Sequence, residues 1–476
     1  MDQAGSILAK SVVEDALKKA EVTDLYNGRR ATVPLDIVVV GCGLGGLAAA
    51  YCLGQAGHKV TVLDSAHAIG EVGAGIQVTP NVTRLLFRWG LRPVLEEVIV
   101  KPEALAFHRW ETGERIAYTR WGDSMTEDHG APYYHIHRAD FHKILFDLAS
   151  SRMTLRLKSR VVGVDPSTPS LTLETGEVVK ADLIVGADGL KSFVREVVIG
   201  GPDKPQATGD AVYRAIVPTS EMMKDPSLQS LVETPEMCGW MGPGRHIMAY
   251  NIRAKKEYNL VMAYPDDGST ESWTAEGDPD QMRGLVAGWE PRIQKLFGLV
   301  KTALKGKLMD RTPLDTWIHK DDKVILLGDA CHPMLPYRAQ GAAMALEDGA
   351  VLGNLFSRLT DRAQLPALIH AYEHLRLPRA SATQASARLN QKIFHLPDGP
   401  QQQARDAEMR QAMRMELGQE IGSVGAGGNE GNANQWADKK KSALQFGYDA
   451  DEEVERWWKE NGQEVLRIRG SVPSRM

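Results

Sequence analysis

Near its N-terminal end the chain contains apolar runs that predict a strand, a helix and a second strand. The β-branched run Ile37–Val40 has the length of a buried strand. Leu44–Ala56 consists mostly of Ala and Leu, which favour helices, and Gly57 stands where a helix commonly ends. Lys59–Leu63 predicts the second strand, which runs into Asp64. We therefore expect a β-α-β unit.

Three glycines occupy the turn between the first strand and the helix of this unit. Gly41 permits a tight turn, Gly43 allows backbone to approach a pyrophosphate, and Gly46 allows the helix to pack closely on the strand. The helix N-terminus then faces the diphosphate, and Asp64 can accept hydrogen bonds from ribose hydroxyls. The unit therefore predicts a dinucleotide site.

Two later stretches repeat the pattern of strand, turn and helix. In residues 181–196, ADLIVGADGLKSFVRE, Asp188 follows a strand and forms a second edge of the predicted nucleotide site. In residues 322–356, Asp329 follows a buried strand and can bind a polyol. The helix that follows starts at Gly341, where free backbone amides suit a developing negative charge.

Residues 207–310 change to short alternating patterns, which predict antiparallel strands and a separate, mostly β domain. In RHIMAYNIR, His246 and Tyr250 are four positions apart, so on a strand both side chains point to one face. Histidine is the natural base near neutral pH and tyrosine can donate or accept a proton, which suits a phenolic substrate. A hydrogen-bonded histidine and a core tyrosine remain the alternative.

The segments between these units carry less chemistry. We expect strands within Ala104–Tyr118 and a helix from Arg138 or Ala139 onward. An earlier helix is predicted to be capped by Asn81, and its Arg84 reaches either a cofactor or solvent.

The two ends of the chain are predicted to be appendages. Residues 1–34 form an extension with an amphipathic stretch at Ser11–Ala20. The Gly- and Asn-rich residues 422–435 predict a flexible linker, because no strand precedes them and no apolar helix follows. The tail FGYDADEEVERWWKENGQ predicts a short helix that packs through its pair of tryptophans.

Composition narrows the class of protein. The 476 residues are 25% charged with a net charge of −5, which indicates an ordinary soluble surface and no nucleic-acid partner. The four cysteines lack the spacing of a metal site or a disulfide scaffold. His135, His137 and His142 have no matching carboxylates, so we expect no metal site. Without an apolar signal core or membrane span, a reduced, cytoplasmic protein is expected.

Three motifs in order carry a resemblance to a known family: GCGLGG at 41–46, GADG at 186–189 and GDACHPMLPYRAQGA at 328–342. With them the chain resembles the class A flavoprotein monooxygenases of the para-hydroxybenzoate hydroxylase type, and within these the fungal salicylate-hydroxylase-like enzymes. The resemblance runs from about residue 35 to residue 390 and includes the tail. It implies an α/β fold with a Rossmann-like FAD-binding domain, a mostly antiparallel β substrate domain and C-terminal helices.

The resemblance also implies residue roles. Arg138 contacts the cofactor, Asp329 holds its ribityl chain, and Pro336 lies beside the reacting face of the flavin. Asp64 stands where Glu is commoner in the family, and Arg338 stands where many relatives have Gly. The cofactor-binding positions are then Gly41, Gly43, Leu44, Gly46, Asp64, Ser65, Gly75, Arg138, Asp188, Asp329, Gly341 and Ala342. The catalytic positions are His246, Tyr250, Arg214 and Pro336.

The implied domain limits divide the chain into four parts. Residues 1–34 are the extension, 35–206 and 311–395 form the FAD-binding domain, 207–310 form the substrate domain, and 396–476 form a helical C-terminal region. Residues 100–131 are a candidate contribution to the substrate domain.

The implied function is FAD-dependent aromatic hydroxylation. NADH or NADPH reduces non-covalently bound FAD, O2 forms a flavin C4a-hydroperoxide, and a small phenolic substrate is hydroxylated. A salicylate-like substrate would also lose CO2. A monomer or homodimer is expected, without a membrane span. Three alternatives stay open: a tailoring monooxygenase for a larger polycyclic phenol, a nicotinamide-only dehydrogenase, and a non-catalytic flavin-binding protein.

Overall fold

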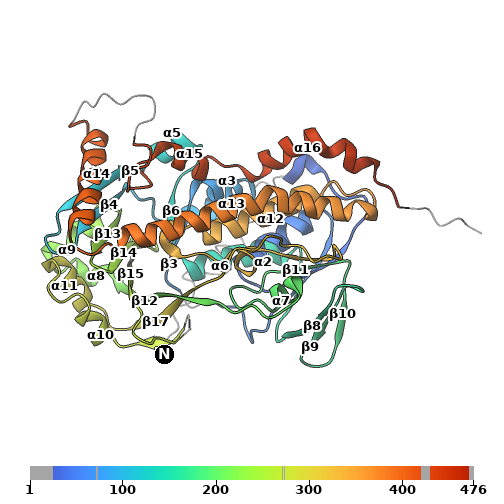
Figure 1. The fold of residues 1–476 in the computed structure, drawn as a ribbon, viewed down its shortest axis with the longest axis horizontal. Helices are drawn as coiled ribbons and strands as arrows, with labels where there is room; N and C mark the ends of the chain where they lie inside the picture. Colours follow the sequence, from blue (N-terminus) through green and yellow to red (C-terminus); the bar gives the residue numbers. More distant parts are fainter. Residues whose placement is uncertain (1–24, 71–72, 271, 273, 420–428, 471–476) are drawn as a thin grey trace, which may run out of the picture.

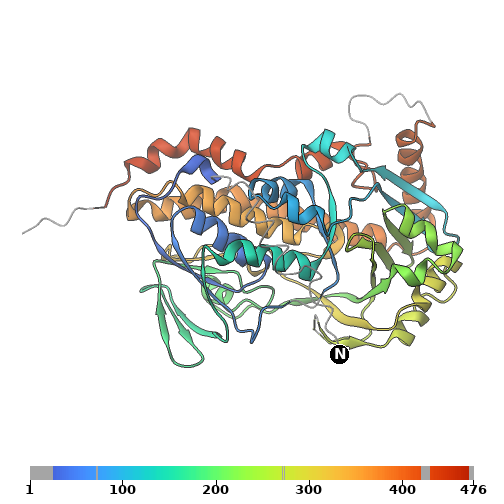
Figure 2. The same cartoon turned by 180° about the vertical axis from the view of Figure 1, so that it is seen from behind.

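The computed structural model describes residues 25–70, 73–270, 272, 274–419 and 429–470. The predicted stretch Ser11–Ala20 and residues 422–428 of the predicted linker lie outside the described residues. Figures 1 and 2 show two parts lying side by side, with the long helix α13 (Leu365–Phe394) extending along both.

A parallel sheet forms the centre of the first part. Its strands, in spatial order, are β18 (Val324–Leu326), β11 (Leu183–Gly186), β1 (Asp36–Val40), β2 (Lys59–Leu63) and β7 (Thr154–Arg156). The predicted β-α-β unit is confirmed, with α2 (Leu44–Gln55) between β1 and β2. Because β1 also pairs with β11, the ends of the first two motifs meet at one edge of the sheet.

Small residues let two helices pack closely in this part. A Cβ atom on Gly349 of α12 (Gly341–Phe356) would lie 2.8 Å from the backbone nitrogen of Ala49 on α2. Real Cβ atoms do not approach other atoms so closely, so glycine is required at that crossing. The close pair holds the first and third motifs in a fixed relation.

The second part is an eight-stranded sheet. Its strands, in spatial order, are β16 (Glu276–Gly277), β17 (Ala303–Asp310), β12 (Gln206–Pro218), β15 (Glu257–Pro265), β14 (Arg245–Ile252), β13 (Glu236–Gly242), β4 (Ala104–Arg109) and β5 (Arg115–Arg120). All neighbours are antiparallel except β13 and β4. The fold class predicted from the sequence is thus confirmed, while the domain limits stay predictions.

The two faces of this sheet pack against different elements. Ile247 and Ala249 of β14 belong to a core that includes Phe297 of α11 (Pro291–Gly298). The alternate residue Tyr250 belongs to a second core with Phe394 at the end of α13. Strand alternation therefore directs one face of β14 toward the parallel-sheet part.

The remaining elements connect or cover these sheets. Two smaller sheets consist of β8 (Val161–Asp165), β9 (Ser170–Leu173) and β10 (Val178–Lys180), and of β3 (Gly75–Val78) with β6 (Tyr134–His137). The other α-helices are α3 (Pro80–Arg88), α4 (Arg92–Glu96), α5 (Ser124–His129), α6 (Arg138–Ser150), α7 (Phe193–Ile199), α8 (Thr219–Met222), α9 (Pro226–Glu233), α10 (Pro279–Gly284), α14 (Pro400–Glu416), α15 (Lys439–Phe446) and α16 (Ala450–Arg467). The 3₁₀ turns are η1 (Leu25–Gly28), η2 (Gly328–Ala330), η3 (Pro336–Arg338) and η4 (Arg362–Gln364). Among the helices of the described ranges, none has the length and apolar character needed to cross a membrane.

Helix α3 differs from its prediction in two details. Its N-cap is Thr79 rather than Asn81, whose buried amide instead donates to Glu347 at 2.6 Å. Arg84 donates to the backbone oxygens of Phe446 and Gly447, each at 3.1 Å. The cap prediction was wrong because tertiary contacts recruit the Asn81 side chain. Arg84 ties the C-terminal segment to the core.

The C-terminal helix α16 confirms the prediction for the tail. Arg88 forms ion pairs with Asp449 and Asp451 at the start of α16. The Arg358 guanidinium lies over the ring of Trp458 at 4.6 Å from its centroid. In Figure 1 this helix lies alongside α13 and α12.

A buried ionic network joins α12 to α13. Arg376 of α13 contacts Glu347 at 2.6 Å and Asp348 at 2.8 Å, and all three side chains are fully buried. Arg379 adds a second ion pair to Glu347 at 2.7 Å. Removing one member of such a network leaves an uncompensated charge in a low-dielectric interior.

We predict that Arg376→Ala lowers the free energy of unfolding by about 3–5 kcal/mol, as measured by urea denaturation. Arg456→Ala is the matched control, because that arginine is 64% exposed and pairs with Glu453 at the surface. The control should change stability by less than about 1 kcal/mol. Equal effects of the two substitutions would contradict the role given to the buried network.

Candidate functional site

The first glycine loop leaves no space for side chains where it meets its neighbours. Gly41 has a φ of 107°, and a Cβ atom there would overlap the carbonyl oxygen of Ala187. A Cβ atom on Gly46 would overlap the carbonyl oxygen of Gly41. At Gly43, by contrast, a Cβ atom would meet nothing within 4 Å, so the loop is open on that side.

The open side coincides with the start of α2. Gly43 is the N-cap and offers no side chain to the free backbone amides of the first turn. Such amides and the helix dipole favour an anion. The Asp64 carboxylate accepts hydrogen bonds from the backbone nitrogens of Cys42 at 2.7 Å and Ala66 at 2.8 Å. Asp64 therefore holds the loop in shape, and Ser65 beside it is exposed.

The second motif packs against this loop through backbone. The Asp188 carboxylate accepts hydrogen bonds from the Ser192 hydroxyl and from the backbone nitrogens of Phe193, at 2.8 Å, and Val194, at 3.1 Å. These contacts hold the start of α7. Asp188 thus positions the GADG turn beside Gly41, and burial raises the pKa of its carboxyl group.

The third motif brings a carboxylate, an arginine and a helix start together. The Asp329 side chain is accessible to solvent, yet desolvation by the surrounding protein raises the pKa of its carboxyl group, an effect that His332 and then Arg138 partly offset. A Cβ atom on Gly341 would lie 4.0 Å from Asp329 Oδ1. The side chain of the N-cap residue Gln340 makes no capping hydrogen bond. The backbone amides of Gly341 and Ala342, the first of α12, therefore have no side-chain cap. This group can bind a polyol and an anion together.

The loop between Asp329 and α12 connects the two parts of the molecule. Pro336 is exposed, whereas the Tyr337 hydroxyl donates to Asp210 of β12 at 2.6 Å. Arg338 is buried, donates to Gln445, and lies over the ring of Trp436 at 4.8 Å from its centroid. The arginine that departs from the family pattern therefore joins this loop to the C-terminal segment.

The face of the eight-stranded sheet that is directed toward this loop carries Tyr250 and Arg214. The ring centroids of Tyr250 and His135 are 4.3 Å apart. A Cβ atom on Gly75 would lie 2.6 Å from the Tyr250 ring. Burial raises the pKa of Tyr250, so its hydroxyl keeps its proton and can donate. Burial, and then Arg138, lower the pKa of Arg214 to about 10, which leaves it charged at neutral pH.

His246 lies on the same face of β14, as its spacing predicts, but in a different group of side chains. Its Nδ1 lies 2.8 Å from Nε2 of His395, and its ring contacts Tyr337 and Phe394. Four residues of a strand span about 13 Å, so His246 and Tyr250 share a face without touching each other. Burial lowers the pKa of His246 well below its ordinary value, which keeps the imidazole neutral.

Sequence reasoning missed three polar residues beside this face: His395, Asp210 and Gln391. The Gln391 amide donates to Asp210 at 2.6 Å, and His395 Nδ1 lies 3.5 Å from the same carboxylate. These residues come from the end of α13 and from β12, and Gln391 and Asp210 are 181 positions apart. No local motif marks them, because only the crossing of α13 over the sheet brings them to His246.

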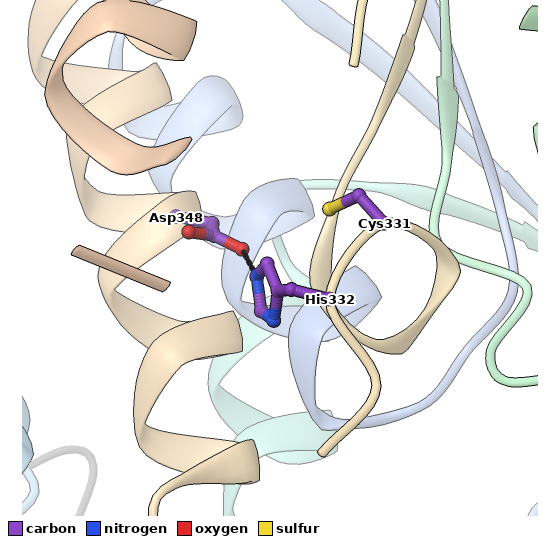
Figure 3. A group of neighbouring side chains, drawn as sticks. All are labelled: Cys331, His332 and Asp348. Atoms are coloured by element: carbon purple, nitrogen blue, oxygen red, sulfur yellow. Dashed lines mark hydrogen bonds and ion pairs between the residues drawn. The ribbon is translucent and has the colours of Figure 1, made fainter. Parts of the chain in front are cut away.

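One buried group of described residues combines side chains that can ligate a metal: Cys331, His332 and Asp348, shown in Figure 3. Asp348 already accepts hydrogen bonds from His332 at 2.6 Å, from Arg376 at 2.8 Å and from the backbone of Gly328 at 3.1 Å. Burial raises the pKa of Cys331, which keeps its thiol protonated. The group therefore extends the ionic network to the third motif.

The histidines considered for a metal site are engaged separately. His142 Nε2 lies 2.8 Å from the carbonyl oxygen of Cys42, and His137 caps α6 by accepting a hydrogen bond from the backbone of Ala139. His135 packs on Tyr133 and Tyr250. Each histidine therefore has its own structural contact.

Known proteins resemble this chain over most of its length. An FAD-dependent monooxygenase of Beauveria bassiana is 35% identical over 88% of this chain and 96% of its own length. A 3-amino-4-hydroxybenzoate 2-monooxygenase of Streptomyces platensis is 36% identical over 80% of this chain and 93% of its own length. The structure of a salicylate hydroxylase in a substrate complex shares the fold with a TM-score of 0.69 at 22% identity, covering 92% of this chain and 99% of that one.

Residues 34–387 match the family described as FAD binding domain. The match includes all three motifs and strands β12 and β14, and it ends before Gln391 and His395. The open loop at Gly43, the start of α12 and the accessible Asp329 are what a dinucleotide of this kind requires. The chain belongs to the FAD binding domain family and, within it, to the FAD-dependent monooxygenases.

Proposed function

We propose that the chain hydroxylates a small phenolic substrate, using FAD, NADH or NADPH, and O2. The observation that carries the proposal is that the loop after Asp329 lies between the free start of α12 and a sheet face with a neutral, buried histidine. The loop after Asp329 would therefore border both the cofactor site and the base that acts on the phenol. Relatives whose names include hydroxybenzoates support the substrate class.

The nucleotide would be held by backbone and by two charged side chains. The amides at the start of α2 would bind the diphosphate beside Gly43, and Asp64 would hold the loop and face the ribose. Arg138 and Asp329 would bind the chain between the phosphates and the ring system. When bound, FAD supplies hydride acceptance and oxygen activation. The amides at Gly341 and Ala342 would stabilise negative charge on its ring.

The residues of the sheet face would bind and activate the phenol. His246 would accept the phenolic proton, because a phenolate donates electrons to an oxygen far better than a phenol does. Tyr250 would donate a hydrogen bond from its protonated hydroxyl, and Arg214 would attract an anionic group such as a carboxylate. Tyr337 and Pro336 would limit access of water to the reacting atoms.

The experiment that tests this function is NAD(P)H consumption by the purified protein against a panel of phenols with and without an ortho carboxylate, with product mass and CO2 followed together. We expect one or more hydroxybenzoates to raise consumption roughly tenfold or more. CO2 release would indicate decarboxylative hydroxylation. Stimulation by larger polycyclic phenols alone would move the assignment to a tailoring enzyme, and no stimulation at all would contradict the proposal.

A second experiment tests the cofactor contacts. We predict that Gly43→Ala weakens FAD binding about 10- to 100-fold, because the added methyl group stands where the diphosphate must approach. The free protein should lose no more than about 1 kcal/mol of stability, since Gly43 has a φ of −75° and no neighbour within 4 Å.

Gly284→Ala serves as the matched control for that experiment. Its added methyl group also meets nothing within 4 Å, but it lies at the end of α10, away from the three motifs. FAD binding, measured by fluorescence titration of the apoprotein, should not change in the control. Unchanged FAD affinity in Gly43→Ala would contradict the placement of the diphosphate.

A further inference from the structure

The proposed base His246 is hydrogen-bonded to a second buried histidine. His246 Nδ1 and His395 Nε2 are 2.8 Å apart, and the two ring centroids are 5.0 Å apart. One of the two nitrogens must carry the proton that the other accepts. A hydrogen bond of this kind links the protonation states of the two rings.

Asp210 continues the chain beyond His395. Its Oδ2 lies 3.5 Å from His395 Nδ1, an ion-pair distance, and accepts hydrogen bonds from Tyr337 and Gln391 at 2.6 Å each. Asp210 lies where the pairing of β12 with β17 shifts register between Ala207 and Ala211. The backbone of Asp210 stays paired with Pro265 of β15, and its carboxylate meets Gln391 and His395 at the end of α13.

These contacts determine which nitrogen is free to act as a base. An ionised Asp210 favours a proton on His395 Nδ1, so His395 Nε2 accepts the hydrogen bond from His246 Nδ1. The lone pair of His246 is then on Nε2. Nε2 is the nitrogen of His246 that does not face His395, so in the proposed function Nε2 accepts the phenolic proton.

The positive charge that follows proton uptake is better accommodated on His395 than on His246. His395 is the C-cap of α13, where the helix dipole favours a cation, and it faces Asp210. His246 instead contacts the rings of Phe394 and Tyr337. Among the residues that the structure describes, Asp210 and Tyr337 are the other titratable groups that contact this pair of histidines.

We propose that His246, His395 and Asp210 form a proton relay that carries the phenolic proton away from the substrate. The phenol O–H bond breaks and its proton binds His246 Nε2. The proton on His246 Nδ1 moves to His395 Nε2, which leaves a phenolate, a neutral His246 and an imidazolium at His395 paired with Asp210. The inference rests on the proposed function and assigns His395 and Asp210 as positioning residues for its base.

The relay is tested by the pH at which a bound phenol ionises. The probe is para-nitrophenol, followed by difference absorbance on the FAD-bound enzyme, which reports phenolate formation without any turnover. In the unmodified enzyme the probe should ionise at a lower pH than in solution. His395→Phe, which retains an aromatic ring, should raise the apparent pKa of the bound probe by about one unit, a tenfold loss of phenolate at a given pH.

Two further variants keep the test decisive. Asp210→Asn retains an acceptor for Tyr337 but removes the charge, so it should shift the titration in the same direction by a smaller amount. His374→Phe is the matched control, because His374 lies on α13 with an exposed side chain. It should titrate as the unmodified enzyme does. If His395→Phe fails to bind FAD, Asp210→Asn alone decides the question.

The outcomes separate the relay from the function on which it rests. Unshifted titration in both His395→Phe and Asp210→Asn, with phenol-stimulated NAD(P)H oxidation in the unmodified enzyme, overturns the relay alone. If the unmodified enzyme neither binds the probe nor responds to any phenol, the proposed function fails and the relay with it. A shift in the two relay variants and not in the control supports the relay.

Discussion

The candidate site depends on one backbone contact, between the first glycine loop and the turn that follows β11. No side chain fits at Gly41 or Gly46, because carbonyl oxygens occupy the space that a Cβ atom would need. This contact brings the carboxyl ends of β1 and β11 together, and it leaves Gly43 as the open side of the loop. The start of α2 can therefore meet a diphosphate without an intervening side chain.

Helix α13 connects the parallel-sheet part to the eight-stranded sheet. In its N-terminal half Arg376 enters the ionic network with α12, and at its C-terminal end His395 reaches His246 on β14. The loop that begins at Asp329 also reaches the eight-stranded sheet, where the Tyr337 hydroxyl donates a hydrogen bond to Asp210. The cofactor side and the proposed phenol side are therefore connected by two sets of buried polar contacts that meet at Asp210 and tolerate little displacement.

The sequence was sufficient to predict features that depend only on residues close together in the chain. Glycines at fixed spacing after a β-branched run predict the β-α-β unit, and alternation in β14 predicts that His246 and Tyr250 share a face. It was insufficient where a side chain serves a distant partner. Asn81 has the chemistry of a helix cap, but the buried Glu347 recruits it, and His395 has no local signal because its role arises from where α13 ends. The histidines that suggested a metal are each engaged in separate structural contacts.

The proposed function requires that this site insert one atom of O2 into a phenolic ring. The most direct measurement is turnover under oxygen-18 gas with mass spectrometry of the product. We expect one labelled oxygen atom in the product for each NAD(P)H consumed in coupled turnover. Label found only in hydrogen peroxide or water, with the phenol recovered unchanged, would show that the protein oxidises NAD(P)H without hydroxylating the ring and would overturn the proposed function.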